Sequence, residues 1–310
     1  KQSNNFLLVI AVNSPDLSLN WTINPYRGCE HGCVYCYARP DHERLGFSSG
    51  LDFETKLLAK PDAPALLRKE LDRPGWRGET VVMSGDTDCY QPIEAKLRIT
   101  RDCLAVMAEC RQPVSIITKN RLVLRDLDYL AQLMFANAVR VAVSVTTLDR
   151  RLAATMEPRA SSPSDRLRTI RELAAAGVPV TAMVAPIIPG LNDREVPGIL
   201  QAVADAGATN AGYVLLRLPH QNKALFESWL RDAFPDRAEH GLSLIRQTRG
   251  GGLYAARFTT RQRGQGPIAE QVGSMFRVFQ KRYHLDRKAP PADRSMFRRP
   301  GGDGQMRLFE

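Results

Sequence analysis

Residues 24–37 read Asn-Pro-Tyr-Arg-Gly-Cys-Glu-His-Gly-Cys-Val-Tyr-Cys-Tyr and place three cysteines, Cys29, Cys33 and Cys36, within eight residues. This spacing favours a metal or iron–sulfur site in a reducing compartment over disulfides. A four-iron cluster that is held by three cysteines keeps one iron without a protein ligand, and a small molecule can chelate it. Gly28 and Gly32 allow the loop to fold back so that the three sulfurs converge.

Two other interpretations of this loop stay open from the residues alone. A zinc knuckle would use the three cysteines together with His31, and buried cysteines without a ligand would need no special geometry. Zinc loops usually bring a second Cys or His pair at a regular distance, and the chain shows no such pair. The iron–sulfur interpretation is therefore preferred.

Short β-rich runs alternate with helical stretches downstream of the loop. Candidate strands cover residues 19–24, 80–84, 114–118, 140–145, 179–185 and 211–217, and helices are expected at 122–136, 164–176 and 195–206. Repeated βα units with apolar strands predict an α/β fold with a parallel sheet, arranged as a complete or partial barrel. In such barrels the chemistry lies at the carboxyl ends of the strands.

The three-cysteine loop, followed by the aromatic residue Tyr37, resembles the signature of the radical S-adenosylmethionine (radical SAM) enzymes. The resemblance implies a partial (β/α)6 TIM-like barrel that binds a [4Fe-4S] cluster through Cys29, Cys33 and Cys36, with S-adenosylmethionine on the open iron. It also implies a 5′-deoxyadenosyl radical that abstracts hydrogen from a substrate in a site closed to water. Such an enzyme needs an electron donor such as flavodoxin or ferredoxin.

Further segments are similar to the spore photoproduct lyase-related branch and, more closely, to a largely uncharacterised bacterial group within it. The similarity spans roughly residues 20–285 and includes 84–88 (Ser-Gly-Asp-Thr-Asp), 117–120 (Ile-Thr-Lys-Asn) and 156–160 (Met-Glu-Pro-Arg-Ala). It implies that Tyr37, Lys119 and Ser144 contact S-adenosylmethionine. A lysine can pair with a carboxylate and a serine can donate to an oxygen, although a solvated lysine and a strand-end serine are the alternatives.

Three acidic residues follow the second candidate strand. Asp86, Asp88 and Glu94 are candidate carboxylates at the mouth of the barrel. Asp86 is also predicted to bind the cofactor. The alternative is that these side chains cap the amino ends of helices.

Cys89 is the candidate catalytic residue, because it lies in the mouth and a thiol can return a hydrogen atom to a product radical. Spore photoproduct lyases use a cysteine in this region, but Gly85 stands at the aligned position here. The alternative is a packed structural thiol. Cys103 and Cys110 share an apolar helical face, which predicts that both are buried in the core.

The net charge is concentrated near the C-terminus of this 310-residue chain. The whole chain carries 43 Lys and Arg against 33 Asp and Glu, and residues 246–310 carry 14 against 5, so +9 of the net +10 lies there. Arg257, Arg261 and Arg263 alternate with Tyr254 and Phe258, a mixture typical of surfaces that contact phosphates. DNA is therefore the expected partner, with a solvated basic tail as the alternative.

The chain is predicted to comprise an N-terminal extension (1–18), the barrel (19–245), a basic segment with an amphipathic helix (246–285) and a flexible tail (286–310). The tail contains Gln305-Met306-Arg307-Leu308-Phe309. This sequence is similar to the Gln-Leu-x-Leu-Phe peptide with which bacterial DNA-processing proteins dock on the sliding clamp. Leu308 and Phe309 would fill an apolar pocket, and Gln305 would make the polar anchor.

No membrane span is expected, because the uncharged run 173–192 contains three prolines and two glycines. The apolar run 6–12 is short and lacks a convincing cleavage site, so a cytoplasmic protein is predicted. The leading hypothesis is a radical SAM enzyme that acts on DNA, through lyase-like lesion repair or base modification. Radical modification of RNA, a peptide or a small molecule is the second, and a non-catalytic iron–sulfur or zinc nucleic-acid adaptor is the third.

Overall fold

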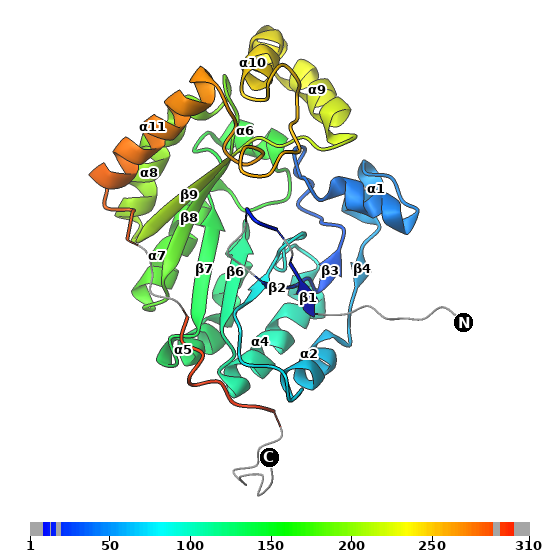
Figure 1. Ribbon diagram of the computed structural model, residues 1–310, viewed down its shortest axis with the longest axis vertical. Helices are drawn as coiled ribbons and strands as arrows, with labels where there is room; N and C mark the ends of the chain where they lie inside the picture. The colour runs from blue at the N-terminus through cyan, green and yellow to red at the C-terminus, as the bar shows by residue number, and fades with distance from the viewer. Residues whose placement is uncertain (1–8, 13, 17–19, 288–291, 301–310) are drawn as a thin grey trace, which may run out of the picture.

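The computed structural model describes residues 9–12, 14–16, 20–287 and 292–300. Its centre is a seven-stranded sheet with the order β1-β2-β5-β6-β7-β8-β9 (Figure 1). β1 (Val9–Ala11) runs antiparallel to its neighbour at one edge. The other strands are parallel: β2 (Trp21–Ile23), β5 (Val81–Met83), β6 (Val114–Thr118), β7 (Val139–Ser144), β8 (Val180–Ile187) and β9 (Asn210–Leu215). These coincide with the six predicted strands, and the α/β partial-barrel fold is confirmed.

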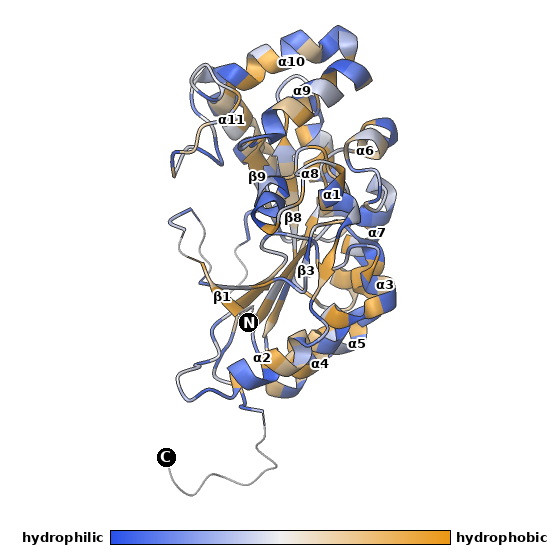
Figure 2. Ribbon diagram, turned by 90° about the vertical axis from the view of Figure 1, so that its right-hand side faces the viewer, coloured by the Kyte–Doolittle hydropathy of each residue, from blue (hydrophilic) through white to orange (hydrophobic). Residues whose placement is uncertain are grey.

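The strands form because β-branched residues stack across the sheet. Val114 lies beside Val81 on one neighbouring strand and beside Val139 on the other, and all three are fully buried. The strands are predominantly hydrophobic, whereas α10 at the top of the molecule carries many hydrophilic residues (Figure 2). Burial on both faces is typical of a parallel sheet that helices cover.

The helices between consecutive parallel strands cover the outer face of the sheet (Figure 1). The predicted helices at 164–176 and 195–206 are confirmed, while the one predicted at 122–136 begins with a 3-10 turn, η2 (Arg121–Asp126). Cys103 and Cys110 of α4 are buried, as predicted. The covering helices are α2 (Ala63–Leu71), α4 (Ile99–Cys110), α5 (Leu127–Phe135), α7 (Pro163–Ala175) and α8 (Val196–Asp205).

Other short elements surround the end of the sheet that holds the three-cysteine loop. A two-stranded antiparallel sheet of β3 (Tyr26–Arg27) and β4 (Leu58–Ala59) flanks that loop. This small sheet and the packed helices α9 and α10 were not predicted from the sequence. The remaining helices here are η1 (Arg39–Leu45), α1 (Leu51–Thr55), α3 (Glu94–Leu97), α6 (Arg150–Met156), η3 (Asp193–Glu195), α9 (Asn222–Ala233) and α10 (Pro235–Gln247).

The basic C-terminal segment contributes the expected amphipathic helix, α11 (Pro267–Arg282), which packs against α8 and β9. Phe276 is buried with its ring 4.6 Å from that of Tyr213 on β9, and the backbone N–H of Ala211 donates to the carbonyl of Leu285. Farther along the chain, Arg298 donates its backbone N–H to the carbonyl of Cys110, the last residue of α4. Within the described residues, no helix combines the length and apolarity needed to cross a membrane.

Candidate active site

The three-cysteine loop connects β3 to η1. Gly28 and Gly32 have φ angles of +76° and +66°, which is the left-handed region that the fold-back prediction requires. The amide of Gly32 donates to the carbonyl of Cys29, and that of Cys36 donates to the carbonyl of Cys33. These two hydrogen bonds close tight turns at Cys29–Gly32 and Cys33–Cys36, so the loop folds back on itself.

The three cysteines of the loop carry free thiols. Cys29 and Cys33 are buried, and Cys36 is partly buried. Burial raises the pKa of Cys29, Cys33 and Cys36, and that of Cys33 reaches about 12. The charges of Asp88 and of the other two cysteines add to the rise in the pKa of Cys29. Thiolates in such a place need a cation to stay ionised, and the iron of a bound cluster would supply that charge.

No three His, Cys, Asp or Glu side chains among the described residues are gathered tightly enough to hold a single metal ion. A cubane cluster makes a different demand, because each thiolate binds a separate iron. His31, the fourth ligand of the zinc alternative, has other partners for both ring nitrogens. Its Nδ1 lies 3.4 Å from the carboxylate of Asp88, and its Nε2 lies 3.2 Å from the side-chain amide nitrogen of Asn120.

Arg39 fixes the shape of the cluster loop. Its guanidinium is buried and donates to the carbonyls of Gly32 and Cys33 within the loop at 3.0 and 2.9 Å. It also donates to two further carbonyls near α1 and pairs with Glu54 at 2.6 Å. Because every contact is charge-assisted, this side chain is a rigid support for the loop.

We expect Gly28→Ala to reduce cluster occupancy, because a Cβ at this left-handed position would lie 2.9 Å from the carbonyl oxygen of Phe53. The backbone strain costs about 1 kcal/mol before the clash is counted. Gly46→Ala is the matched control, since its φ is +79° and a Cβ there would meet nothing within 4 Å. Iron and sulfide content after anaerobic reconstitution tests this, and equal loading of the two variants would contradict it.

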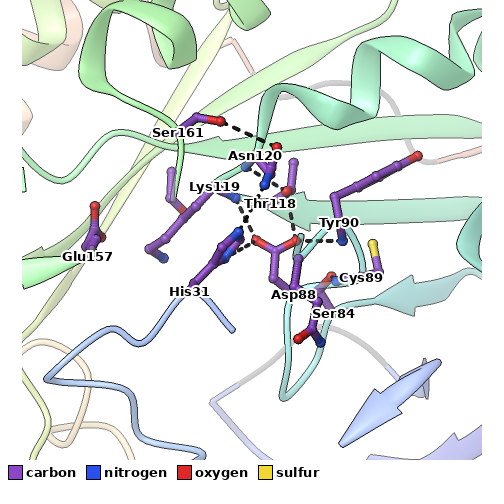
Figure 3. A network of polar contacts seen from close by, with 12 residues as sticks. His31, Ser84, Asp88, Cys89, Tyr90, Thr118, Lys119, Asn120, Glu157 and Ser161 are labelled. Atoms are coloured by element: carbon purple, nitrogen blue, oxygen red, sulfur yellow. Dashed lines mark hydrogen bonds and ion pairs between the residues drawn. The ribbon is translucent and has the colours of Figure 1, made fainter. Parts of the chain in front are cut away.

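Asp88 joins the cluster loop to the ends of two strands (Figure 3). Its carboxylate accepts from the hydroxyl of Thr118 at 2.8 Å and from the backbone N–H of Lys119 at 2.7 Å, both at the end of β6. It also accepts from the backbone of Tyr90 at 2.9 Å and lies beside His31. The predicted mouth carboxylate is therefore an organising centre that connects β5, β6 and the loop.

Lys119 lies close to the cluster cysteines. Its ammonium is 5.9 Å from the ring centre of Tyr35, and its charge lowers the pKa of Cys33, Cys36 and Glu157 against the effect of burial. A cation beside the cluster is suited to the carboxylate of S-adenosylmethionine, as the sequence predicts. Ser144, the other predicted contact, is buried at the end of β7.

Glu157 and Arg166 form a buried ion pair behind the loop. Tyr35 donates its hydroxyl to Glu157, as does Thr146 at 2.8 Å. Arg166 also donates to the carbonyls of Ser161 at 2.8 Å and Ser144 at 3.2 Å. Burial alone would raise the pKa of Glu157, but Arg166 and Lys119 lower it to about 2.

Tyr37 and Asp86 lie on the other side of the loop. The Tyr37 hydroxyl donates to the carbonyl of Gly85, and the backbone N–H of Asp86 donates to Asn24 at 2.9 Å. Burial raises the pKa of Asp86, and the nearby Asp41 adds to the rise. Asp86 lines a cavity of about 40 Å³ beside the cluster loop. Both predicted residues therefore flank the loop.

Two other predicted mouth residues face the core. Cys89 is fully buried, and its sulfur lies on the far side of Asp88 from His31 (Figure 3). Burial raises the pKa of its thiol well above the usual value. Glu94 is also fully buried and accepts from the backbone of Thr100 at the start of α4. Glu94 is thus a helix-capping carboxylate, and the catalytic role of Cys89 stays a prediction.

The three predicted nucleic-acid arginines have different surroundings. Arg257 is exposed, Arg261 pairs with Asp16, and Arg263 stacks on Tyr213 with its guanidinium 4.0 Å from the ring centre. Their joint role in binding DNA stays a prediction. The predicted clamp residues Gln305, Leu308 and Phe309 lie outside the described residues.

A family model of the radical SAM superfamily matches residues 23–203. The chain belongs to this superfamily. Radical SAM enzymes use a [4Fe-4S] cluster and S-adenosylmethionine, and both cofactors therefore belong to this protein. Cys29, Cys33 and Cys36 are free thiols that fit the cluster by donor chemistry, and their role as its ligands stays a prediction.

The radical SAM chain has relatives without an assigned function. It is 38% identical over 237 residues to an uncharacterized protein of Mycobacterium tuberculosis (strain ATCC 25618 / H37Rv), which covers 76% of this chain and 70% of that protein. It is 30% identical over 224 residues to an uncharacterized protein of Acidianus two-tailed virus, covering 69% and 73%. These relatives leave the substrate open.

The fold of this radical SAM enzyme is similar to that of spore photoproduct lyase. A structure of that lyase complexed with dinucleoside spore photoproduct matches with a TM-score of 0.62, 17% identity, and coverage of 90% of this chain and 78% of the other. A structure of a point mutant of the same lyase matches with a TM-score of 0.61, 16% identity, and coverage of 91% and 78%. The partial barrel is shared over nearly the whole chain.

Several residues of the site were not predicted. Residues 156–160 entered the sequence comparison only as part of the resemblance. The buried ion pair of Glu157 and Arg166 was not predicted. Arg39 and the network of His31 were also missed. Polar residues inside otherwise apolar βα units were the available signal, because buried charges are rare unless they are paired.

Proposed function

We propose that this radical SAM enzyme acts on DNA, through repair of a lesion or modification of a base. The observation that carries the enzymatic part is the convergence of the three-cysteine loop, Asp88 and Lys119 at the carboxyl ends of the parallel strands. When bound, the cluster and S-adenosylmethionine supply a 5′-deoxyadenosyl radical. An electron donor such as flavodoxin or ferredoxin would reduce the cluster, and a reducing cytoplasm would keep the thiols available.

The chain's own residues would hold and orient the cofactors. Lys119 offers its ammonium to a carboxylate, while Tyr37 offers a partly exposed ring beside the loop. Asp88 fixes the backbone of Lys119, so the position of this cation follows that of β6. The buried Glu157 and Arg166 hold Tyr35 and thereby the back of the loop.

DNA as substrate is supported by charge and by analogy. The C-terminal segment 246–310 carries +9 of the net +10 charge, and an excess of positive charge attracts a polyanion. A structural neighbour with the same barrel is complexed with a dinucleoside photoproduct. Since a shared fold does not by itself determine a substrate, the lesion-specific form of the proposal depends on a direct assay.

We expect the reconstituted enzyme to form more 5′-deoxyadenosine with its substrate than without it. The assay compares ultraviolet-irradiated DNA, undamaged DNA and RNA under anaerobic conditions with dithionite as reductant, and chromatography measures 5′-deoxyadenosine. Stimulation by DNA supports the proposal, and stimulation by irradiated DNA alone supports lesion repair. A response to RNA alone would contradict DNA as the substrate, and no 5′-deoxyadenosine under any condition would favour an adaptor.

A further inference from the structure

Arg217 lies two residues after the end of β9 and reaches the mouth of the barrel beside the cluster loop. Its guanidinium lies 5.3 Å from the ring centre of Tyr37, the residue that follows Cys36. Tyr37 is 44% exposed, and its hydroxyl is held by the carbonyl of Gly85. A planar cation is thus stacked on an anchored ring that a ligand can reach.

The guanidinium of Arg217 makes no hydrogen bond or ion pair with the described part of the chain. Its Nε atom is buried and has no partner there. Asp16, an acid whose pKa the charge of Arg217 lowers, is engaged by the backbone N–H of Thr259 at 2.6 Å and by Arg261. A buried N–H donor without an acceptor lowers the stability of the protein. The planar guanidinium group of arginine can donate to two oxygens of one anion at the same time.

A second arginine increases the positive charge behind Arg217. Arg249 is buried and donates to the carbonyls of Leu215 and Leu216, the residues that precede Arg217, at 3.0 and 2.6 Å. Burial and the charge of Arg217 lower the pKa of Arg249 to about 10. The Nε of Arg249 also lacks a partner among the described residues. The two guanidinium groups add positive charge at this end of β9, and such charge favours an anion there.

Two acidic residues near Tyr37 belong to a different place. Asp41 and Asp86 line the small cavity beside the cluster loop, and Arg217 is not among the residues that line it. Lys119 lies 5.9 Å from the ring centre of Tyr35 within the cluster loop, so it is a separate candidate partner for the carboxylate of S-adenosylmethionine.

We propose that Arg217, stacked on Tyr37 and backed by Arg249, binds a phosphodiester group of the substrate at the mouth of the barrel. This inference rests on the proposed action on DNA. It identifies how a polymeric substrate would be held beside the radical: Arg217 is the phosphate contact that places one nucleotide next to the cluster loop. The arginines of segment 257–263 are not required for this contact.

The test measures binding of two probes to the reconstituted holoenzyme. Thymidylyl-thymidine carries one phosphodiester, and its methylphosphonate analogue has the same shape without the charge. We expect Arg217→Gln to weaken binding of the first probe about tenfold and to leave the second unchanged. Arg277→Gln is the control, because it removes one positive charge from α11, where Arg277 donates to Ser274. It should change the affinity for either probe less than about twofold.

A third titration, with S-adenosylmethionine, separates the two possible sources of the anion. Unchanged affinity for S-adenosylmethionine in Arg217→Gln supports the proposal, whereas a loss there with unchanged dinucleotide binding overturns it. An equal loss for both dinucleotide probes also overturns it, since the effect would then not depend on phosphate charge. Should Arg217→Gln lose dinucleotide binding while DNA fails to stimulate 5′-deoxyadenosine, the phosphate site stands and the proposed substrate is wrong.

Discussion

Cys36→Ala is expected to abolish the cluster and, with it, formation of 5′-deoxyadenosine. The loop supplies three thiols for a cluster whose fourth iron must stay open, so removal of one leaves two protein ligands. The reconstituted variant should lose the broad visible absorbance that is typical of iron–sulfur clusters. Iron content and chromatography of 5′-deoxyadenosine measure the two effects.

Cys103→Ala is the matched control for this experiment. Cys103 is buried in α4 within the main core, and its sulfur is not part of the cluster loop. The substitution removes a thiol and leaves a small cavity at a cost of about 1 kcal/mol, but it should load iron as the native protein does. Loss of iron in both variants would show that the assay reports folding instead of ligation. Full 5′-deoxyadenosine formation by Cys36→Ala would refute its assignment as a ligand.

Arg166→Leu is expected to lower the free energy of unfolding by about 3–5 kcal/mol, because it leaves the carboxylate of Glu157 buried without its partner. Arg166 is 2% exposed, and its loss also removes the bonds to the carbonyls of Ser144 and Ser161. Since Glu157 accepts from Tyr35 in the cluster loop, we also expect weaker iron retention. Urea denaturation under anaerobic conditions measures the stability change.

Arg168→Leu is the control for burial, because Arg168 pairs with Glu172 on the same helix, α7, and its side chain is 67% exposed. Exposed pairs of this kind contribute little, so the change should stay below about 0.5 kcal/mol. The double variant Glu157→Leu with Arg166→Leu should be more stable than Arg166→Leu alone, since no charge remains buried. Equal effects of Arg166→Leu and Arg168→Leu would contradict the assigned role of the buried pair.

Much of the architecture could be predicted because it depends on local pattern. The six parallel strands are short runs of β-branched and apolar residues, and their alternation with helices restricts the sheet to a parallel barrel. The cluster loop could be predicted for the same reason, since Cys29, Cys33 and Cys36 lie within one turn-rich segment. Where long-range packing matters, the prediction was less complete, as with the pairing of β3 and β4 across the cluster loop and two helices.

The sequence by itself determined the family and the cofactors, because these depend on residues that are close together in the chain. Only the tertiary structure decided that Glu94 caps a helix, that His31 is engaged on both sides, and that Arg217 reaches Tyr37. Tyr37 and Arg217 are 180 residues apart in sequence, and no periodicity relates them. Their stacking is a product of the fold, which places the chain just after β9 beside the loop that follows β2 and β3.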